Sequence, residues 1–306
     1  MVSHSQRPEA SPKKPIVGGG IRYYLYLIPT FGLLLVFGYY PPISAIYHSF
    51  FNWDGVTFSQ FIGLGNYERL FHSGLMGIAT INVLKLMLWG LIAGILPALG
   101  VAELLLTIRS KRAQYWYRVL LVAPIVVPGI VGILLWEFLM GPNYGFFNTI
   151  LAALRLPTFL FFASPRQALY SFMFMGFPWI SAVNVLILLA GLMNVGRDLF
   201  DAAALDGASW FQRFRHIDVP LIVGQIKLLV ILGLIGGFQG FIAQLVITQG
   251  GPAFSTEVPG LLMYQSAFSY QEMGYASAIG VVMFLVVLGL TVVNMKFVRS
   301  SVDYQP

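Results

Sequence analysis

Four aspartates and one histidine lie close together in a polar segment that separates two long apolar segments. They are Asp198, Asp201, Asp206, His216 and Asp218. Carboxylates and imidazoles bind metals and carry out acid–base catalysis in proteins. The spacing of these five residues suits neither a metal site nor a catalytic dyad, so a membrane-embedded enzyme is not indicated. We interpret the segment instead as a docking site for a soluble partner.

The composition indicates that this docking segment belongs to a membrane protein. Of 306 residues, 58% are hydrophobic and 10% are charged, whereas soluble domains carry about 25% charged residues. The net charge of +6 therefore requires no nucleic acid as a partner. The chain has no cysteine, which excludes disulfides, thiol chemistry and cysteine-based zinc sites. Its four histidines lack the spacing of metal ligands, and we expect no metal.

Six apolar segments are long enough to cross a bilayer, which takes about 20 helical residues. The predicted spans are Tyr23–Ile46, Thr80–Leu106, Val119–Met140, Ala168–Met193, Leu221–Gln249 and Tyr275–Phe297. The expected fold is therefore an all-α integral membrane domain over residues 23–306. Residues 1–22 are polar, contain three consecutive glycines and are predicted to form a flexible tail.

Basic residues fall mainly on one side of this predicted arrangement. They occur in the tail, in the second and fourth loops and near the C-terminus, whereas the other side has only Arg69, Arg155 and Arg166. The positive-inside rule then predicts that both termini and residues 194–220 are cytoplasmic. On the outer side, Phe147–Leu156 is expected to be either a short surface helix or a simple packed loop.

Ionisable residues inside the predicted spans can indicate a substrate or ion pathway. The four present are Lys85, Glu103, Glu137 and Lys227. Each lies close enough to a span end to reach an interface, so a structural role is favoured over a substrate role. The absence of a midplane carboxylate or an acid–histidine chain argues against an ion-coupled secondary carrier. The chain also has no phosphate-binding G-x-x-x-x-G-K-[ST] loop, so a pump of this kind needs a separate ATPase.

Residues 194–220 are predicted to form two short helices joined by a sharp turn. Asp198 suits the positive end of the first helix, and the three alanines from Ala202 favour helix and present a flat surface. Gly207 permits the turn, and Pro220 can begin the next span without losing a needed N–H. The second helix has an aromatic face made of Trp210, Phe211 and Phe214. An ordinary amphipathic hairpin is the alternative interpretation.

The same segment resembles the EAA loop of ABC-importer permeases, through Asp201-Ala202-Ala203, Gly207 and Ile217-x-Val219-Pro220 at the expected offsets. The family has Glu where this chain has Asp201, which keeps the charge. The chain resembles the carbohydrate-uptake branch of binding-protein-dependent permeases over nearly its whole length after residue 22. The other residues that carry this resemblance are Phe61–Tyr67, Asn82, Trp136, Gly145, Asn148, Leu189–Leu192, Gly250-Gly251-Pro252 with Thr256, and Gly274–Ala278.

The resemblance implies a type I ABC-importer permease in a bacterial or archaeal plasma membrane. The implied partners are a sister permease, two ATPase subunits, an external substrate-binding protein and membrane lipid. ATP and magnesium would be bound by the ATPase, so this chain would hold no cofactor and would not be an enzyme. The residues implied to contact the ATPase are Asp201, Ala202, Ala203, Gly207, Trp210, Phe211, Ile217 and Pro220.

Candidate substrate contacts lie in the fourth and fifth predicted spans, because sugars stack on aromatic rings and bond to amides. They are Gly176, Phe177, Trp179, Asn184, Gly237, Gln239, Gly240 and Gln244. Glycines in membrane helices also serve close helix packing, which is the competing explanation. A sugar is the favoured substrate. The alternatives are glycerol phosphate, another non-sugar solute such as an amino acid or peptide, or a secondary carrier.

Overall fold

The computed structural model describes residues 20–297, with side chains described from Tyr24 onward except those of Arg197 and Phe297. The predicted flexible tail therefore lies outside the described residues up to position 19. Helix α1 already begins at Gly20, two residues before the expected end of that tail.

The described chain is almost entirely helical. In order, the elements are α1 (Gly20–Leu33), η1 (Leu34–Tyr39), α2 (Tyr40–His48), β1 (Phe51–Trp53), β2 (Ser59–Phe61), α3 (Gly65–His72), α4 (Gly74–Thr107), α5 (Lys111–Val122), η2 (Ala123–Val126), α6 (Gly129–Leu139), α7 (Phe146–Ala153), η3 (Phe161–Ala163), α8 (Ala168–Phe174), α9 (Ala182–Met193), α10 (Arg197–Leu205), α11 (Trp210–Arg213), η4 (Phe214–Asp218), α12 (Val219–Leu221), α13 (Val223–Gln239), α14 (Ile242–Ile247), α15 (Pro259–Tyr264), η5 (Gln265–Ser269) and α16 (Met273–Phe297).

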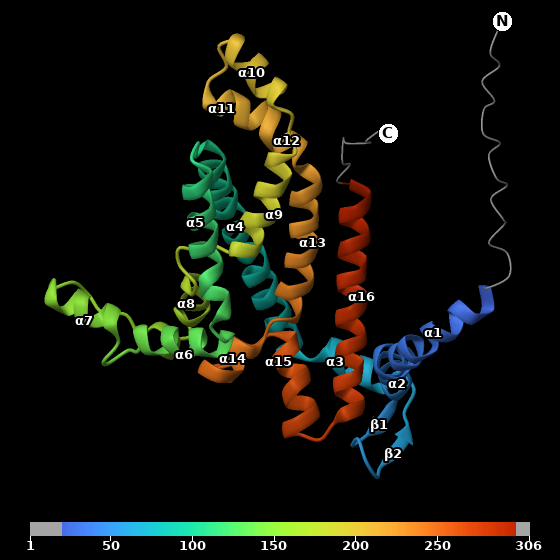
Figure 1. Ribbon diagram of the computed structural model, residues 1–306. Helices are drawn as coiled ribbons and strands as arrows, with labels where there is room; N and C mark the ends of the chain where they lie inside the picture. The colour runs from blue at the N-terminus through green and yellow to red at the C-terminus, as the bar shows by residue number, and fades with distance from the viewer. Residues whose placement is uncertain (1–19, 298–306) are drawn as a thin grey trace, which may run out of the picture.

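The body of the molecule is a bundle of long helices (Figure 1). Helix α4 packs against α9 and α13, and α13 packs against α16. One buried cluster, which includes Val83, Phe238 and Ile279, joins α4, α13 and α16. A second, which includes Leu188 and Leu229, joins α4, α9 and α13. Burial of large aliphatic and aromatic side chains at these contacts holds the bundle together.

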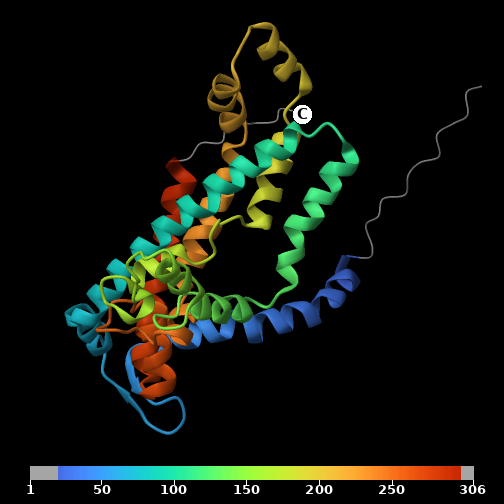
Figure 2. The same ribbon diagram turned by 90° about the vertical axis from the view of Figure 1, so that its left-hand side faces the viewer.

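The two ends of the bundle differ. Helices α10–α12, the α4–α5 turn and the end of α16 lie at one end, and the strands, α3, α14 and α15 lie toward the other (Figure 1). Segments α1–α2 and α6–α7 extend away from the bundle, and Figure 2 shows that α5 descends at a distance from α4. The best apolar window of Tyr24–His48 buries none of its residues within this chain. Such exposed apolar surface is typical of a face covered by lipid or by another subunit.

Four described helices are long and apolar enough to cross a membrane: Tyr24–His48, Gly74–Thr107, Val223–Ile247 and Met273–Lys296. These correspond to the predicted first, second, fifth and sixth spans. Two bent pairs would raise the number to six: Lys111–Val126 with Gly129–Leu139, and Ala182–Met193 with Asp198–Leu205. The prediction of six continuous spans is therefore wrong for the third and the fourth.

The third predicted span breaks at Pro128, where the two halves meet at 85°. Val127 is extended, with φ −74° and ψ 124°. A residue before proline is pushed away from helical geometry, and proline itself provides no N–H for the helix. Local chain chemistry thus overrides the continuous hydrophobicity of this segment.

The fourth predicted span breaks between α8 and α9. Gly176 has φ +82° and Trp179 has φ +57°, and Pro178 lies between them. Left-handed backbone and a proline cannot continue a right-handed helix. The fifth span has a related interruption at Gly240, which is extended and separates α13 from α14.

The all-α prediction misses one small hairpin. Strands β1 and β2 pair antiparallel, with Phe51 opposite Phe61. Asp54 organises the turn by accepting hydrogen bonds from the backbone N–H of Val56, the hydroxyl group of Thr57 and the backbone N–H of Phe58. These bonds hold the pKa of Asp54 well below its usual range. On the opposite flank, α7 confirms a short helix within the predicted 147–156 segment.

Candidate functional site

The hairpin over residues 194–220 contains the two short helices that its sequence predicts. Gly207 turns the chain with φ +70°, and the N–H of Ala208 donates to the carbonyl of Ala203 at 3.0 Å. Ser209 and Gln212 then cap the second helix reciprocally, each side chain bonding to the other residue's N–H. The turn and cap fix the angle between α10 and α11 through local backbone chemistry.

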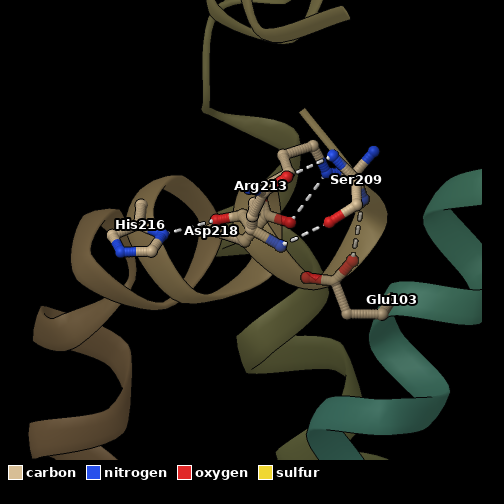
Figure 3. A network of polar contacts seen from close by, with 6 residues as sticks. Glu103, Ser209, Arg213, His216 and Asp218 are labelled. Atoms are coloured by element: carbon tan, nitrogen blue, oxygen red, sulfur yellow. Dashed lines mark hydrogen bonds and ion pairs between the residues drawn. The ribbon is translucent and has the colours of Figure 1, made fainter. Parts of the chain in front are cut away.

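A buried ion network ties this hairpin to the bundle (Figure 3). The Arg213 guanidinium donates to Asp218 at 3.0 Å and to Glu103, on α4, at 3.2 Å. The side chains of Glu103 and Asp218 are 2% and 0% exposed, so both carboxylates are desolvated and depend on Arg213. The expectation that Glu103 reaches an interface is wrong, because the hairpin covers it.

The hairpin presents part of its surface outward. Asp201, Ala202, Gly207, Trp210 and Phe211 are exposed. The Trp210 ring, 55% exposed, stacks on Phe214 with centroids 5.3 Å apart. A hollow of about 470 Å³ lies between α10 and the second half of the hairpin.

Three of the predicted ATPase contacts face inward to some degree. Ala203 is buried, and Ile217 and Pro220 are half-buried. These three contribute to the packing of the hairpin, although Ala203 and Ile217 also border its hollow. Contact of the eight predicted residues with an ATPase stays a prediction.

Four of the predicted substrate residues come together at one hollow of about 460 Å³. Gly237, Gln239, Gly240 and Gln244 line it where α13 is interrupted, and Met175 lines it from the break after α8. Among residues 20–297, the side-chain amides of Gln239 and Gln244 form no hydrogen bond. These amides are available to bind the hydroxyl groups of a solute.

Three of the other four predicted substrate residues lie at the break between α8 and α9. Trp179 donates its indole N–H to the carbonyl of Met173 at 3.0 Å, and Trp89 of α4 donates to the same oxygen at 2.7 Å. Phe177 lies against Trp179 with ring centroids 5.0 Å apart, and it is 54% exposed. Gly176 provides the left-handed turn.

Asn184 is used in a different way. Its side-chain amide donates to the carbonyl of Gly94 at 2.9 Å and so joins α9 to α4. This bond uses one N–H of the amide that was expected to bind substrate, and substrate contact by Asn184 stays a prediction.

Another hollow, of about 550 Å³, lies next to the one that Gln239 and Gln244 line. Glu137, at the end of α6, lines it together with Thr248 and Pro252. Helix α14 borders both hollows, through Gln244 on one and Ile247 on the other. Sequence reasoning gave Glu137 a structural role and did not identify this hollow, because only the packing of α6 against α14 creates it.

The two lysines of the predicted spans lie outside these hollows. Lys85 is exposed on α4, and Lys227 donates to the carbonyl of Met295 at 3.0 Å. Within residues 20–297, no group of three or more histidines or carboxylates is arranged to hold a metal ion. In the described chain, the two hollows that α14 borders are lined by apolar side chains, amides, aromatic rings and one carboxylate, that of Glu137.

Comparisons with known proteins identify the family of this chain. Residues 88–300 match the family described as "Binding-protein-dependent transport system inner membrane component". This chain belongs to that family. It is therefore the membrane component of a binding-protein-dependent transport system, and it is a transport subunit that passes the membrane several times.

The permease has relatives of nearly the same length. "Probable ABC transporter permease protein YurN" of Bacillus subtilis (strain 168) is 31% identical, covering 91% of this chain and 96% of the relative. "Trehalose/maltose transport system permease protein MalF" of Thermococcus litoralis is 29% identical, covering 92% and 94%. A bacterial ABC transporter for import of the acidic polysaccharide alginate has the same fold, with TM-score 0.78, 21% identity, and coverage of 91% and 96%.

Proposed function

We propose that this permease is the subunit through which an ATP-driven importer passes a sugar. The observation that carries the proposal is the hollow at the interrupted helices, where the amides of Gln239 and Gln244 have no partner within residues 20–297. Transporters commonly place substrate sites where helices are discontinuous, since unwound backbone and free polar groups are available there. The trehalose/maltose permease is a relative whose name agrees with such a substrate.

The 194–220 hairpin is proposed to dock on an ATPase subunit. Its exposed surface carries three carboxylates, Asp198, Asp201 and Asp206, beside small and aromatic side chains. Movement of the hairpin would pass to α4 through the bond between Arg213 and Glu103. ATP binding and hydrolysis would take place on the partner, and this chain would change conformation in response.

The proposed complex contains this chain, a sister permease and two ATPase subunits, and an external binding protein delivers the sugar. Both termini and the hairpin would face the cytoplasm of a bacterial or archaeal cell. The placement of the hairpin, the α4–α5 turn and the end of α16 at one end of the bundle supports this orientation (Figure 1).

The test uses the complete complex in lipid nanodiscs, with sugar-loaded binding protein added. We expect Asp201→Lys to abolish stimulation of ATP hydrolysis, and Gln244→Leu to weaken stimulation by sugar while basal hydrolysis persists. Matched controls are Glu68→Lys and Gln60→Leu, because both residues are exposed and lie outside the hairpin and hollows. Absence of a co-purifying ATPase, or equal stimulation in all four variants, would contradict the proposal.

A further inference from the structure

Glu137 is a carboxylate on the wall of a largely apolar hollow, and it has no partner among the described residues. It lies in the last turn of α6, is half-buried, and forms no ion pair or hydrogen bond with any residue between 20 and 297. Opposite it are the hydroxyl group of Thr248 and the turn at Gly251 and Pro252. A carboxylate in such a place is free to meet whatever occupies the hollow.

The described residues that line the hollow of Glu137 include no basic side chain. Among the wall residues that the described chain contributes to this hollow and to the adjoining amide hollow, Glu137 carries the only charge. A further carboxyl group lies in the loop that follows Thr248. The hydroxyl groups of Thr248 and Thr256 are hydrogen-bonded at 2.7 Å, and Thr256 directly precedes the buried Glu257. The described walls of the two hollows are therefore negative or neutral.

The two hollows are neighbours along one helix. The hydroxyl of Thr248 donates to the carbonyl of Gln244 at 3.2 Å, one helical turn away. The rings of Phe162 and Phe172, which border different hollows, contact each other with centroids 4.9 Å apart. A solute in the amide hollow thus lies about one turn of α14 from the hollow that Glu137 lines.

We propose that Glu137 determines the charge of the transported solute, admitting uncharged sugars and repelling anionic ones. This inference rests on the proposed function and narrows its substrate class. The hydroxyl groups of a neutral sugar can donate charge-assisted hydrogen bonds to the carboxylate. A uronate or a phosphate would meet a like charge in a partly desolvated site, where repulsion is much stronger than in water.

The first test measures the charge preference of the hollow directly. The chain has no cysteine, so Ala163→Cys places one thiol on the wall of this hollow. In the complete complex with cysteine-free partners, its reaction rates with trimethylammonium and sulfonate methanethiosulfonates are compared. We expect the cationic reagent to be favoured by roughly tenfold or more, as for other focused fields, and Glu137→Gln to remove most of that preference.

The control is Ala163→Cys combined with Glu68→Gln, which removes an exposed carboxylate elsewhere and should leave the preference intact. The inference is overturned if the preference for the cationic reagent is the same with Glu137 and in the Glu137→Gln variant. It is also overturned if neither reagent reacts. Lack of reaction would mean that water does not fill the hollow.

The second test measures uptake by proteoliposomes of matched neutral and anionic sugars, namely mannotriose with trimannuronate and methyl glucoside with methyl glucuronide. Because the binding protein is unchanged, its own selectivity cancels when wild type and Glu137→Gln are compared. We expect the anionic-to-neutral uptake ratio to rise about tenfold in the variant, which corresponds to about 1.4 kcal/mol.

The outcomes separate the two proposals. Uptake of an anionic sugar in preference to its neutral counterpart by the wild type overturns the charge inference and leaves sugar import standing. Failure of every carbohydrate, delivered by the binding protein, to stimulate the complex overturns the proposed function and the inference with it.

Discussion

The guanidinium of Arg213 lies 3.2 Å from the carboxylate of Glu103, although 110 residues separate them in the chain. The same guanidinium bonds to Asp218, so one cation serves two buried carboxylates. Glu103 Oε1 and Asp218 Oδ1 have no partner among the described residues. Displacing the hairpin from α4 would expose or unpair these groups, so the hairpin and α4 are expected to move together.

Replacing Arg213 should therefore destabilise the protein. Arg213→Met leaves two carboxylates buried without a counter-ion, a change that typically costs about 3–5 kcal/mol. Thermal unfolding in detergent measures the loss. Arg215→Met is the matched control, since Arg215 is exposed two residues away and its replacement should cost less than about 0.5 kcal/mol. Equal losses in the two variants would refute the role assigned to the network.

The turn at Gly207 should tolerate no side chain without strain. A Cβ there has open space, but φ is +70°, so Gly207→Ala should cost about 1–2 kcal/mol through the backbone alone. Gly224→Ala, in the first turn of α13, also meets open space without left-handed backbone and should be neutral or stabilising by up to about 1 kcal/mol. Unfolding temperature and ATPase stimulation of the complex are the measurements. A neutral Gly207→Ala would show that the hairpin relaxes freely.

Gly274 marks a close approach between α16 and strand β1. A Cβ at this position would clash with the backbone carbonyl oxygen of Phe51, which cannot move aside as a flexible side chain can. Gly274→Ala should destabilise the protein by about 1–3 kcal/mol. On the same helix, Gly289→Ala meets nothing within 4 Å and should be neutral or stabilising by up to about 1 kcal/mol. Melting curves of both variants, recorded side by side, decide the question.

Glu257 should make stability depend on pH. Burial raises the pKa of its carboxyl group from 4.5 to about 7, and desolvation is the only cause. The folded state thus holds a proton that the unfolded state releases. The stabilisation is fully present below pH 4.5 and is lost as the pH rises through about 7.

The free energy of unfolding should fall by on the order of 3 kcal/mol as the pH rises from 4.5 to about 7, which follows from the size of the pKa shift. Glu257→Gln remains neutral at every pH and should flatten the profile of unfolding temperature against pH. Glu68→Gln serves as the exposed control and should retain the wild-type slope. A wild-type profile without this decline would mean that the carboxyl group is solvated.

Much of the architecture follows from local sequence. Long apolar runs predicted α4, α16 and the α13–α14 pair with ends within about six residues of the observed ones, because hydrocarbon requires helices of about 20 residues. Gly207 and the alanines before it predicted the hairpin, since turn geometry and helix propensity are properties of neighbouring residues. The breaks at Pro128 and Gly176 had local signals too, but uninterrupted hydrophobicity obscured them.

The tertiary structure alone decided which polar groups meet. A span that is apolar all round has no distinct face, so hydrophobic periodicity cannot indicate which side chains point into the bundle. Nothing local linked Arg213 to Glu103, brought Glu137 beside Thr248, or distinguished the occupied amide of Asn184 from the free amide of Gln244. Those relationships depend on how separate helices pack, and electrostatic partners are chosen by proximity in space.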